Sequence, residues 1–344
     1  MSNGPDTAVL RVRRAGPFVT VQDAGRPGLM RYGVPLSGPM DRFGFAAAHM
    51  VLGRAAVQAA VQAAIEVSLG GLTLECVSGA VAVAVCGGGF RVSHSGRDIG
   101  SWAVCTLRPG DTLAITAGSW GSWCYLAFAG ELQAEQWLGS ASTHVRSGLG
   151  GGTVQTGNDL VVQHASVDDA RSGPVDVPAV AHPTDVLRVV PGPQEHCFKP
   201  GALDTLVGGT YTLSTAYDRM GVRLDGPTLE LDGSLAIPSS PIIRGSLQVA
   251  GDGVPTLLFA DHQTTGGYPK IATVIGPDAA RAAQLRSGQT IRFASVSPEQ
   301  AVSAARVAAV DEHAALTRLA DRPGLRTRHL LSSNLIDGGF HPDE

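Results

Sequence analysis

Hydrophobic residues along the chain fall mainly into short runs rich in β-branched side chains, and turns containing glycine or proline separate these runs. The clearest runs cover residues 79–87, 111–118, 159–165, 185–192, 209–215, 256–262 and 289–296. Apolar runs of this length between turn formers are typical of β-strands. The 44 glycines and 21 prolines are what many short strands joined by tight turns require. The pattern therefore predicts a mainly β fold.

Three segments have helical signals instead. An Ala-rich stretch over residues 41–67 follows Pro39, and residues 276–288 carry a proline at a helix start. Ser297, Pro298 and Glu299 open a final predicted helix over residues 297–320. We therefore expect only a few helices beside the strands.

The two halves of the chain repeat each other. Leu10-Arg11-Val12 recurs 177 positions later as Leu187-Arg188-Val189, and Asp41-Arg42 recurs at the same offset as Asp218-Arg219. Further along, Gly88-Gly89-Phe90 matches Gly266-Gly267-Tyr268 after a slip of one residue. One nearly constant offset over this length indicates duplication of a structural unit.

The repeat divides the chain into two homologous β domains, residues 1–166 and 186–297. Residues 167–185 between them are rich in Ser, Asp and Pro, as an exposed linker is. Residues 298–344 form a C-terminal helix and tail outside the repeat. The second domain has no counterpart of the Ala-rich segment, because its Asp218-Arg219 pair runs into a sequence that reads as a strand.

Composition excludes several classes of protein. The formal net charge is -4 with Lys and Arg thinly spread, so the basic surface of a nucleic-acid binder is missing. Neither a signal peptide nor a membrane-spanning run is found, so we expect a cytoplasmic protein without a membrane or nucleic-acid partner. The five cysteines include no CxxC pair, which indicates reduced thiols in the core. The histidines are scattered along the sequence, so no metal site is predicted.

Reactive side chains are concentrated in residues 257–273, between two strand-like runs. The other copy of the repeat keeps the glycines but has no polar equivalent of Asp261, His262, Gln263 or Lys270. A hydrogen-bonded β-bulge would explain the stretch structurally. We favour a functional role, because a duplicated scaffold needs the glycines but not the other side chains. His262 is suited to acid–base chemistry and Lys270 to balancing a developing negative charge.

The candidate site residues follow from these observations. Asp261, His262 and Lys270 are the predicted catalytic residues. The predicted substrate-binding residues are those around them and those of a polar, turn-rich segment near the N-terminus: Gln263, Thr264, Thr265, Gly266, Gly267, Tyr268, Gln22, Asp23 and Arg26.

The repeated Asp-Arg pairs have two interpretations. An Asp that caps a turn beside an Arg that bridges to a carboxylate is a common way to build a domain corner. A guanidinium group can instead hold a carboxylate or another planar anion. Because the pair occurs in both halves, we favour the structural interpretation for Arg42 and Arg219.

Several motifs together resemble one known family. They are "TVQDAGRPGLMRYGVPLSGPMDR", "STAYDRMGVRLDGP" and "LFADHQTTGGYPKIATVI". Over about residues 9–296 the chain resembles the allophanate hydrolase subunit 2 family, also known as 5-oxoprolinase C subunits or the biotin-dependent carboxyltransferase family. The resemblance implies two tandem cyclophilin-like β-barrel domains. It also implies a partner B subunit of the allophanate hydrolase subunit 1 type, together with an A subunit in some members.

The resemblance further implies a function and its alternatives. The expected function is that of the C subunit in a multi-subunit, ATP-dependent 5-oxoprolinase, a hydrolase that opens the small cyclic amide 5-oxoproline to glutamate. Alternatives are the carboxyltransferase part of a biotin-dependent urea or amide carboxylase, and a non-catalytic antagonist of a kinase inhibitor. We expect no cofactor on this chain, with ATP bound by a partner or biotin carried by another chain. Gln263, Thr264 and Lys270 are suited to polarising an amide.

Overall fold

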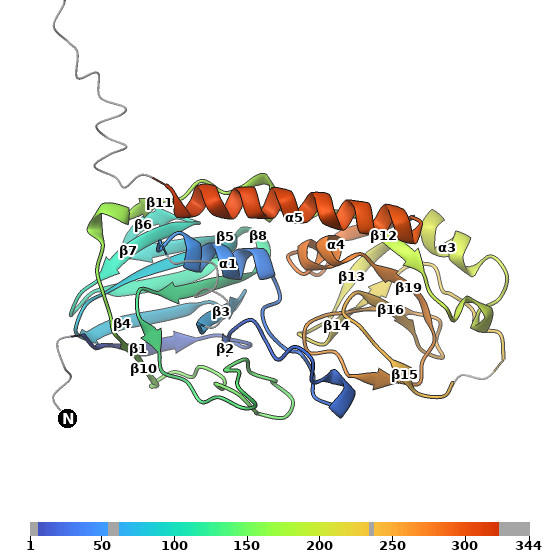
Figure 1. Ribbon diagram of the computed structural model, residues 1–344, viewed down its shortest axis with the longest axis horizontal. Coiled ribbons are helices and arrows are strands. Elements are labelled where there is room, and N and C mark those ends of the chain that lie inside the picture. Colours follow the sequence, from blue (N-terminus) through green and yellow to red (C-terminus); the bar gives the residue numbers. More distant parts are fainter. Residues whose placement is uncertain (1–5, 54–61, 234–236, 323–344) are drawn as a thin grey trace, which may run out of the picture.

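The chain folds into two β lobes that lie side by side under one long helix, as the computed structural model shows (Figure 1). The structure describes residues 6–53, 62–233 and 237–322. Strands in the first lobe form one eleven-stranded sheet, and the core of the second lobe is a closed barrel. The predicted mainly β fold with few helices is confirmed.

The first lobe takes its strands from residues 8–174. They are β1 (Ala8–Ala15), β2 (Thr20–Gln22), β3 (Ala64–Ser68), β4 (Leu72–Ser78), β5 (Val81–His94), β6 (Arg97–Gly100), β7 (Ala103–Leu107), β8 (Thr112–Phe128), β9 (Glu131–Leu132), β10 (Asp159–Gln163) and β11 (Gly173–Pro174). The main path through the sheet is β11-β7-β5-β8-β4-β1-β10-β9, and β2, β3 and β6 branch from it. Strand β11 belongs to the predicted linker, yet it pairs with β7. The domain boundaries at residues 166 and 186 stay a prediction.

Strand β5 up to Phe90 and residues 121–128 of β8 are buried on both faces, which explains their mostly apolar sequences. Val83 and Val85 point into one core of the lobe. Ala84 and Cys86, the alternate residues, point into a second core beneath helix α1 (Arg42–Met50). Successive side chains of a strand point to opposite faces, so a strand between two cores needs apolar residues at every position. Small residues on the helix side let α1 lie close to the sheet.

The second lobe closes into a barrel with the order β12-β19-β16-β17-β14-β13-β20. Its strands are β12 (Val186–Pro191), β13 (Thr210–Tyr217), β14 (Gly221–Asp225), β16 (Ser246–Val249), β17 (Pro255–Leu258), β19 (Lys270–Val274) and β20 (Thr290–Ser295). Two short strands outside the barrel, β15 (Ser240–Pro241) and β18 (Thr265–Gly266), pair with each other. A separate apolar core fills this barrel.

The helices cover the sheets and join the lobes. The described helices are α1, α3 (Ala202–Gly208), α4 (Gly276–Ala282) and α5 (Pro298–Ala320), with 3-10 turns at η1 (Met30–Tyr32), η2 (Asp169–Arg171), η3 (Ala179–Ala181) and η4 (Glu195–Cys197). The predicted helix over residues 41–67 is wrong at its end, because residues 64–68 form β3 and pair with β8. Residues 54–61 of that segment lie outside the described residues.

Helix α5 spans both lobes. Its N-terminus is a capping box, in which Ser297 Oγ accepts from the Gln300 backbone N and the Gln300 side chain accepts from the Ser297 backbone N. Ala315 and Leu319 near its other end pack into the core that α1 covers, while other contacts reach β12 and α4 in the second lobe. The final predicted helix is therefore confirmed, and the tail beyond residue 322 lies outside the described residues.

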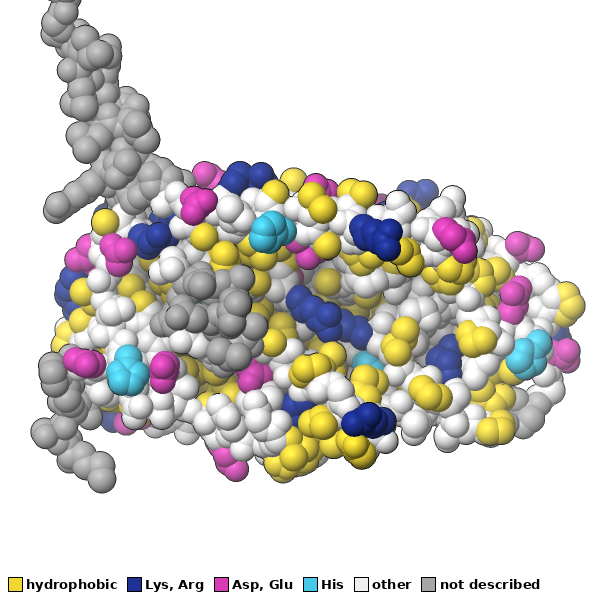
Figure 2. All heavy atoms as spheres, viewed as in Figure 1, with side chains coloured by type: hydrophobic (Ala, Val, Ile, Leu, Met, Phe, Trp, Pro, Cys, Tyr) yellow, Lys and Arg dark blue, Asp and Glu magenta, His cyan; other side chains and the backbone are white. Residues whose placement is uncertain are grey.

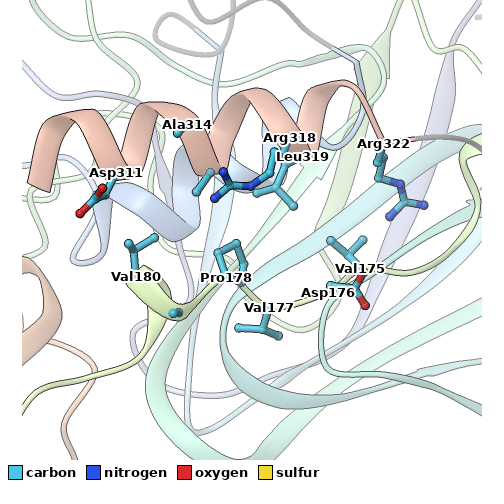
Figure 3. Close-up of a pocket in the computed structure, with 12 residues that line it drawn as sticks. Val175, Asp176, Val177, Pro178, Val180, Asp311, Ala314, Arg318, Leu319 and Arg322 are labelled. Carbon is cyan, nitrogen blue, oxygen red and sulfur yellow. The ribbon is translucent and has the colours of Figure 1, made fainter.

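The segment that connects the lobes runs beneath α5. Val177, Pro178 and Val180 of this segment face Arg318 and Leu319 of the helix across a cavity of about 560 Å³ (Figure 3). Helix and connection together therefore link the two lobes along one edge. No helix in the described parts of the chain combines the length and the apolar character that crossing a membrane requires. All five cysteines are free, and four of them are buried.

Candidate active site

The polar stretch 257–273 leaves the barrel after β17, forms part of a flap, and returns as β19. We call residues 237–244 and 262–268 the flap. Its two arms are joined by the β15–β18 pair and by backbone bonds from Ile242 N to Thr264 O (3.0 Å) and from Ile237 N to Gly267 O (3.0 Å). Thr264, Thr265, Gly266 and Gly267 thus form one arm of the flap.

Asp261 lies at the base of the flap and pairs with Arg219, which connects the two lobes. Both of its carboxylate oxygens accept from Arg219, at 2.9 and 3.0 Å. The same guanidinium group binds Glu66, which lies on β3 of the other lobe. All three side chains are at most 2% exposed. Burial opposes the charge on Arg219, but the two carboxylates outweigh burial and raise its pKa above the ordinary value.

Further buried hydrogen bonds surround this ion cluster. Tyr125 Oη donates to Glu66 at 2.8 Å, and the Met40 backbone N donates to the same oxygen at 2.8 Å. Gln284 of the second lobe donates through its Nε2 to Asp41 of the first lobe at 2.7 Å. A buried network with its partners in place resists rearrangement, because any lost bond leaves a polar group without water. The network therefore sets the orientation of one lobe against the other.

His262 is a buried neutral imidazole with a defined tautomer. The side chain is 2% exposed, and its Nδ1 lies 2.7 Å from the backbone carbonyl of Gln263. A carbonyl only accepts, so Nδ1 carries the proton and Nε2 keeps its lone pair. Burial lowers the pKa of His262 and thereby favours the neutral form. A neutral imidazole with a free lone pair is the form that a general base requires.

Burial of His262 predicts a pH dependence of stability. Its folded-state pKa is below the unfolded value of about 6.5, so the unfolded state binds more protons as the pH falls. The stabilising contribution is therefore complete above about pH 6.5 and is lost as the pH falls toward the folded pKa. We expect the Tm of the wild type to fall more steeply in acid than that of His262→Gln. Thermal melts across this pH range test the slope, and a variant of the exposed residue, His313→Gln, is the control; equal slopes in all three proteins would contradict the prediction.

Lys270 lies below the flap as a buried ammonium group. Its side chain is 7% exposed, and Nζ donates to Ser240 Oγ at 2.5 Å. The side chain of Gln194 forms hydrogen bonds to both Lys270 and Ser240. It accepts from the Lys270 backbone N (2.9 Å) and donates to Ser240 Oγ (3.1 Å). No ion pair to Lys270 occurs among the described residues. Burial lowers its pKa, and its charge is available to a negative group that forms nearby.

Gln263 and Tyr268 line a cavity of about 670 Å³ beside the flap. Gln248 lies between them, since it accepts from Gln263 Nε2 at 3.1 Å and donates to the carbonyl of Tyr268 at 3.3 Å. Side-chain amides are donors and acceptors that match an amide ligand. The lining also includes Arg223, which is paired with Asp252 at 2.6 Å. The cavity therefore offers amide donors and acceptors to a ligand, while its lining arginine is already paired.

In the structure, Gln22, Asp23 and Arg26 contact residues 137–143 of the first lobe. Burial lowers the pKa of Arg26, and the nearby carboxylates of Asp23 and Asp261 act in the opposite direction. Asp23 accepts from Ser140 Oγ and Ser142 Oγ, each at 2.6 Å, and from the Ala141 backbone N at 2.7 Å. Arg26 donates to the carbonyls of Trp137 (2.9 Å) and Ser140 (3.1 Å) and lies 5.1 Å from the Trp137 ring centroid.

Gln22 likewise bonds within this region, to Thr20 Oγ1 at 2.9 Å and to the Thr143 carbonyl at 3.1 Å. These contacts hold the local structure, but among the described residues Gln22 Oε1 and Arg26 Nη1 are buried without a hydrogen-bond partner. Their binding of substrate stays a prediction.

Sequence reasoning brought the candidate residues together, but the structure distributes them in three directions. Asp261 pairs with Arg219 at the contact between the lobes, Lys270 contacts Ser240 of the flap, and Gln263 and Tyr268 line the cavity. No hydrogen bond connects the side chains of Asp261, His262 and Lys270 to one another within the described residues. Glu66 was missed, although a lone carboxylate inside the apolar run 63–67 is a signal of a buried ion pair.

Two bacterial proteins match almost the whole chain. It is 35% identical to the 5-oxoprolinase C subunit of Haemophilus influenzae over 83% of this chain and 91% of the relative. The identity to the 5-oxoprolinase C subunit of Escherichia coli is 31%, over 86% of this chain and 94% of the relative. Urea amidolyase of Lachancea kluyveri is 28% identical, and there the match covers 83% of this chain but 17% of the larger protein.

Solved structures share the fold. The crystal structure of TTHA0988 matches with a TM-score of 0.73 and 29% sequence identity. The match covers 86% of the chain described here and 57% of the TTHA0988 chain. The urea amidolyase of K. lactis has a TM-score of 0.78 over 90% of this chain at 24% identity, which is evidence for the fold alone. The family model described as "Carboxyltransferase domain, subdomain A and B" matches residues 32–295, nearly all of both lobes. The chain therefore belongs to the carboxyltransferase domain family, subdomains A and B.

Proposed function

We propose that this chain is the C subunit of a multi-subunit 5-oxoprolinase that opens 5-oxoproline to glutamate. The observation that carries the proposal is the similarity to two bacterial 5-oxoprolinase C subunits, which extends over more than nine tenths of each relative. The family model spans residues 32–295, which include the barrel and the flap.

In this proposal, the flap region handles the amide. His262 Nε2 accepts a proton from the attacking water and returns it to the lactam nitrogen as the C–N bond breaks. The Lys270 ammonium stabilises the negative charge that develops on the amide oxygen. Gln263 and Gln248 supply amide donors and acceptors at the cavity where the lactam is held. Asp261 acts as a positioning residue, because its carboxylate forms an ion pair with Arg219.

The proposal includes partner proteins. A C subunit is by its name one part of a larger assembly, so we propose that a B subunit and an A subunit complete the enzyme. ATP is then bound by a partner, which agrees with the cavity beside the flap, whose lining arginine is already paired with an aspartate.

A second candidate function is carboxyl transfer from biotin carried by another chain. It is favoured by the family model and by the similarity to urea amidolyase, in which the matching part is a small share of a larger protein. Both candidates act on a small amide, so the flap residues would serve either reaction.

The test is ATP-dependent release of glutamate from 5-oxoproline by this chain co-expressed with its partner B and A subunits. Parallel reactions omit one chain at a time or add avidin, which sequesters biotin. Turnover that requires all three chains and is unaffected by avidin is the expected result. Turnover of another amide that avidin blocks would instead support the carboxyltransferase, and a stable complex without turnover of any amide would contradict both.

A further inference from the structure

Three side chains under the flap form a closed set of hydrogen bonds. The Lys270 ammonium donates to Ser240 Oγ at 2.5 Å, and Gln194 Nε2 donates to the same oxygen at 3.1 Å. Gln194 closes the set, because its Oε1 accepts from the Lys270 backbone N at 2.9 Å. Ser240 lies on β15, Lys270 begins β19 and Gln194 precedes η4. Three elements far apart in the sequence therefore bring these groups together.

The chemistry of the three groups fixes the direction of each bond. An ammonium group has donors only, so Lys270 Nζ must donate. A backbone N–H also donates, so the amide oxygen of Gln194 faces Lys270 and its amide nitrogen is left to donate to Ser240. Ser240 Oγ therefore accepts two hydrogen bonds, which uses both of its lone pairs.

The Ser240 hydroxyl is left to act as a donor. A hydroxyl carries one O–H beside its two lone pairs. Within residues 6–53, 62–233 and 237–322 this O–H has no acceptor, since both hydrogen bonds of the Ser240 side chain are ones that it accepts. Ser240 is half-buried, so water or a ligand can reach it. The O–H is therefore available to an acceptor that a ligand brings.

Strand pairing places Ser240 beside the cavity that Gln248 and Gln263 line. Ser240 is the direct partner of Gly266 in the β15–β18 pair, and opposite residues of an antiparallel pair have their Cβ atoms on one face, about 5 Å apart. A Cβ atom at Gly266 would lie 2.8 Å from the amide nitrogen of Gln248 and 3.4 Å from that of Gln263. Ser240 therefore shares a face with the two side-chain amides at the cavity.

The positive charge of Lys270 lies behind this hydroxyl. In the space-filling view, uncharged side chains and backbone cover most of the surface around β15 (Figure 2). The Lys270 side chain is 7% exposed, and its hydrogen-bonding partner is the neutral Ser240. A cation that donates to a hydroxyl polarises it and makes its O–H a stronger donor.

We propose that Ser240 is a catalytic residue whose O–H binds the oxygen of the substrate amide. The Lys270 ammonium acts through this hydroxyl, and Gln194 is a positioning residue that holds both groups. Negative charge that develops on the amide oxygen is then met by a donor already polarised by a cation. The role rests on the proposed function, in which the amide is the lactam of 5-oxoproline, and it adds the side chain that contacts the lactam oxygen.

The experiment measures the kinetics of Ser240→Ala with 5-oxoproline, in the complex of this chain with its B and A partners. We expect kcat to fall about 10²–10³-fold, which is the effect of removing one oxyanion donor, while KM changes much less. Ser240→Thr keeps a hydroxyl and should recover most of the lost kcat. Ser303→Ala, at an exposed position of α5, is the matched control and retains the wild-type kcat.

A double variant tests whether Lys270 acts through Ser240. If it does, combining Ser240→Ala with Lys270→Met lowers kcat no further than the more damaging single variant. Effects that multiply would overturn the coupling of the two groups. Wild-type kcat in Ser240→Ala, with or without a lower Tm, would show that the hydroxyl has a structural role alone and would overturn the proposal.

Failure of the proposed function is a different result. A wild-type complex that leaves 5-oxoproline unchanged overturns the function, and Ser240 is then tested with 2-pyrrolidinone, a lactam with the same ring carbonyl. The side-chain amide resonances of Gln248 and Gln263 report its binding. Shifts in the wild-type chain that are lost in Ser240→Ala support the donor. No shifts in the wild type, or equal shifts in both proteins, overturn it.

Discussion

Replacing Arg219 with methionine is expected to lower the free energy of unfolding by about 3–5 kcal/mol. The guanidinium group is 2% exposed and neutralises Asp261 and Glu66, which are equally inaccessible to water. Its loss leaves two carboxylates buried at the contact between the lobes without a counter-charge, and removing one partner of a buried ion cluster is strongly destabilising. Urea denaturation monitored by tryptophan fluorescence measures the change.

Two further variants make this prediction specific. Arg223→Met removes an exposed arginine whose ion pair with Asp252 is about half accessible, so a change of at most about 1 kcal/mol is expected. Combining Arg219→Met with Asp261→Asn and Glu66→Gln should restore part of the lost stability, because no buried charge then remains unpaired. If Arg219→Met unfolds at the wild-type urea concentration, the ion cluster does not stabilise the contact between the lobes.

Replacing Lys270 with alanine is expected to lower kcat for 5-oxoproline by about 10²–10³ without unfolding the protein. The ammonium group is buried, donates to Ser240 Oγ, and lacks an ion pair among the described residues. Such a positive charge stabilises the transition state more than the ground state, because negative charge develops on the amide oxygen in a site from which water is excluded. Steady-state kinetics of the three-protein complex measures the effect, and circular dichroism reports the fold.

The chain offers a matched control at its other lysine. Lys199 pairs with Glu230 on the surface, and both side chains are more than half exposed. Lys199→Ala should therefore retain wild-type turnover. Lys270→Met preserves the apolar length of the side chain without its charge, and it should be as inactive as Lys270→Ala. Wild-type rates in either Lys270 variant would exclude an electrostatic role for this residue.

Much of the fold was predictable from local patterns. The apolar runs at residues 79–87 and 209–215 became β5 and β13, and the cap at Ser297 did open the final helix. These features depend on neighbouring residues, which the sequence displays directly. The predicted helix over residues 41–67 ended too late, because residues 64–68 pair with β8 and are buried on both faces. A short apolar run of this kind does not distinguish a strand from a helix.

The candidate site was predictable as a stretch but not as an arrangement. The concentration of polar residues over 257–273 marked the flap and its base. It did not reveal that Asp261 would form an ion pair with Arg219 or that Lys270 would donate a hydrogen bond to Ser240. These partners are 42 and 30 residues away in the sequence. Neighbouring residues in extended backbone point in opposite directions, so adjacency in sequence separates side chains instead of gathering them.

The sequence by itself determined the strand-rich architecture and the family, because these depend on local periodicity and on motifs that survive in linear order. Only the tertiary structure decided what the two copies of the Asp-Arg pair do. Arg219 meets Glu66 across the contact between the lobes, whereas Arg42 is exposed at the start of α1. Whether an arginine is neutralised depends on carboxylates brought near it by chain segments far away in sequence, and that proximity exists only once both lobes have packed together.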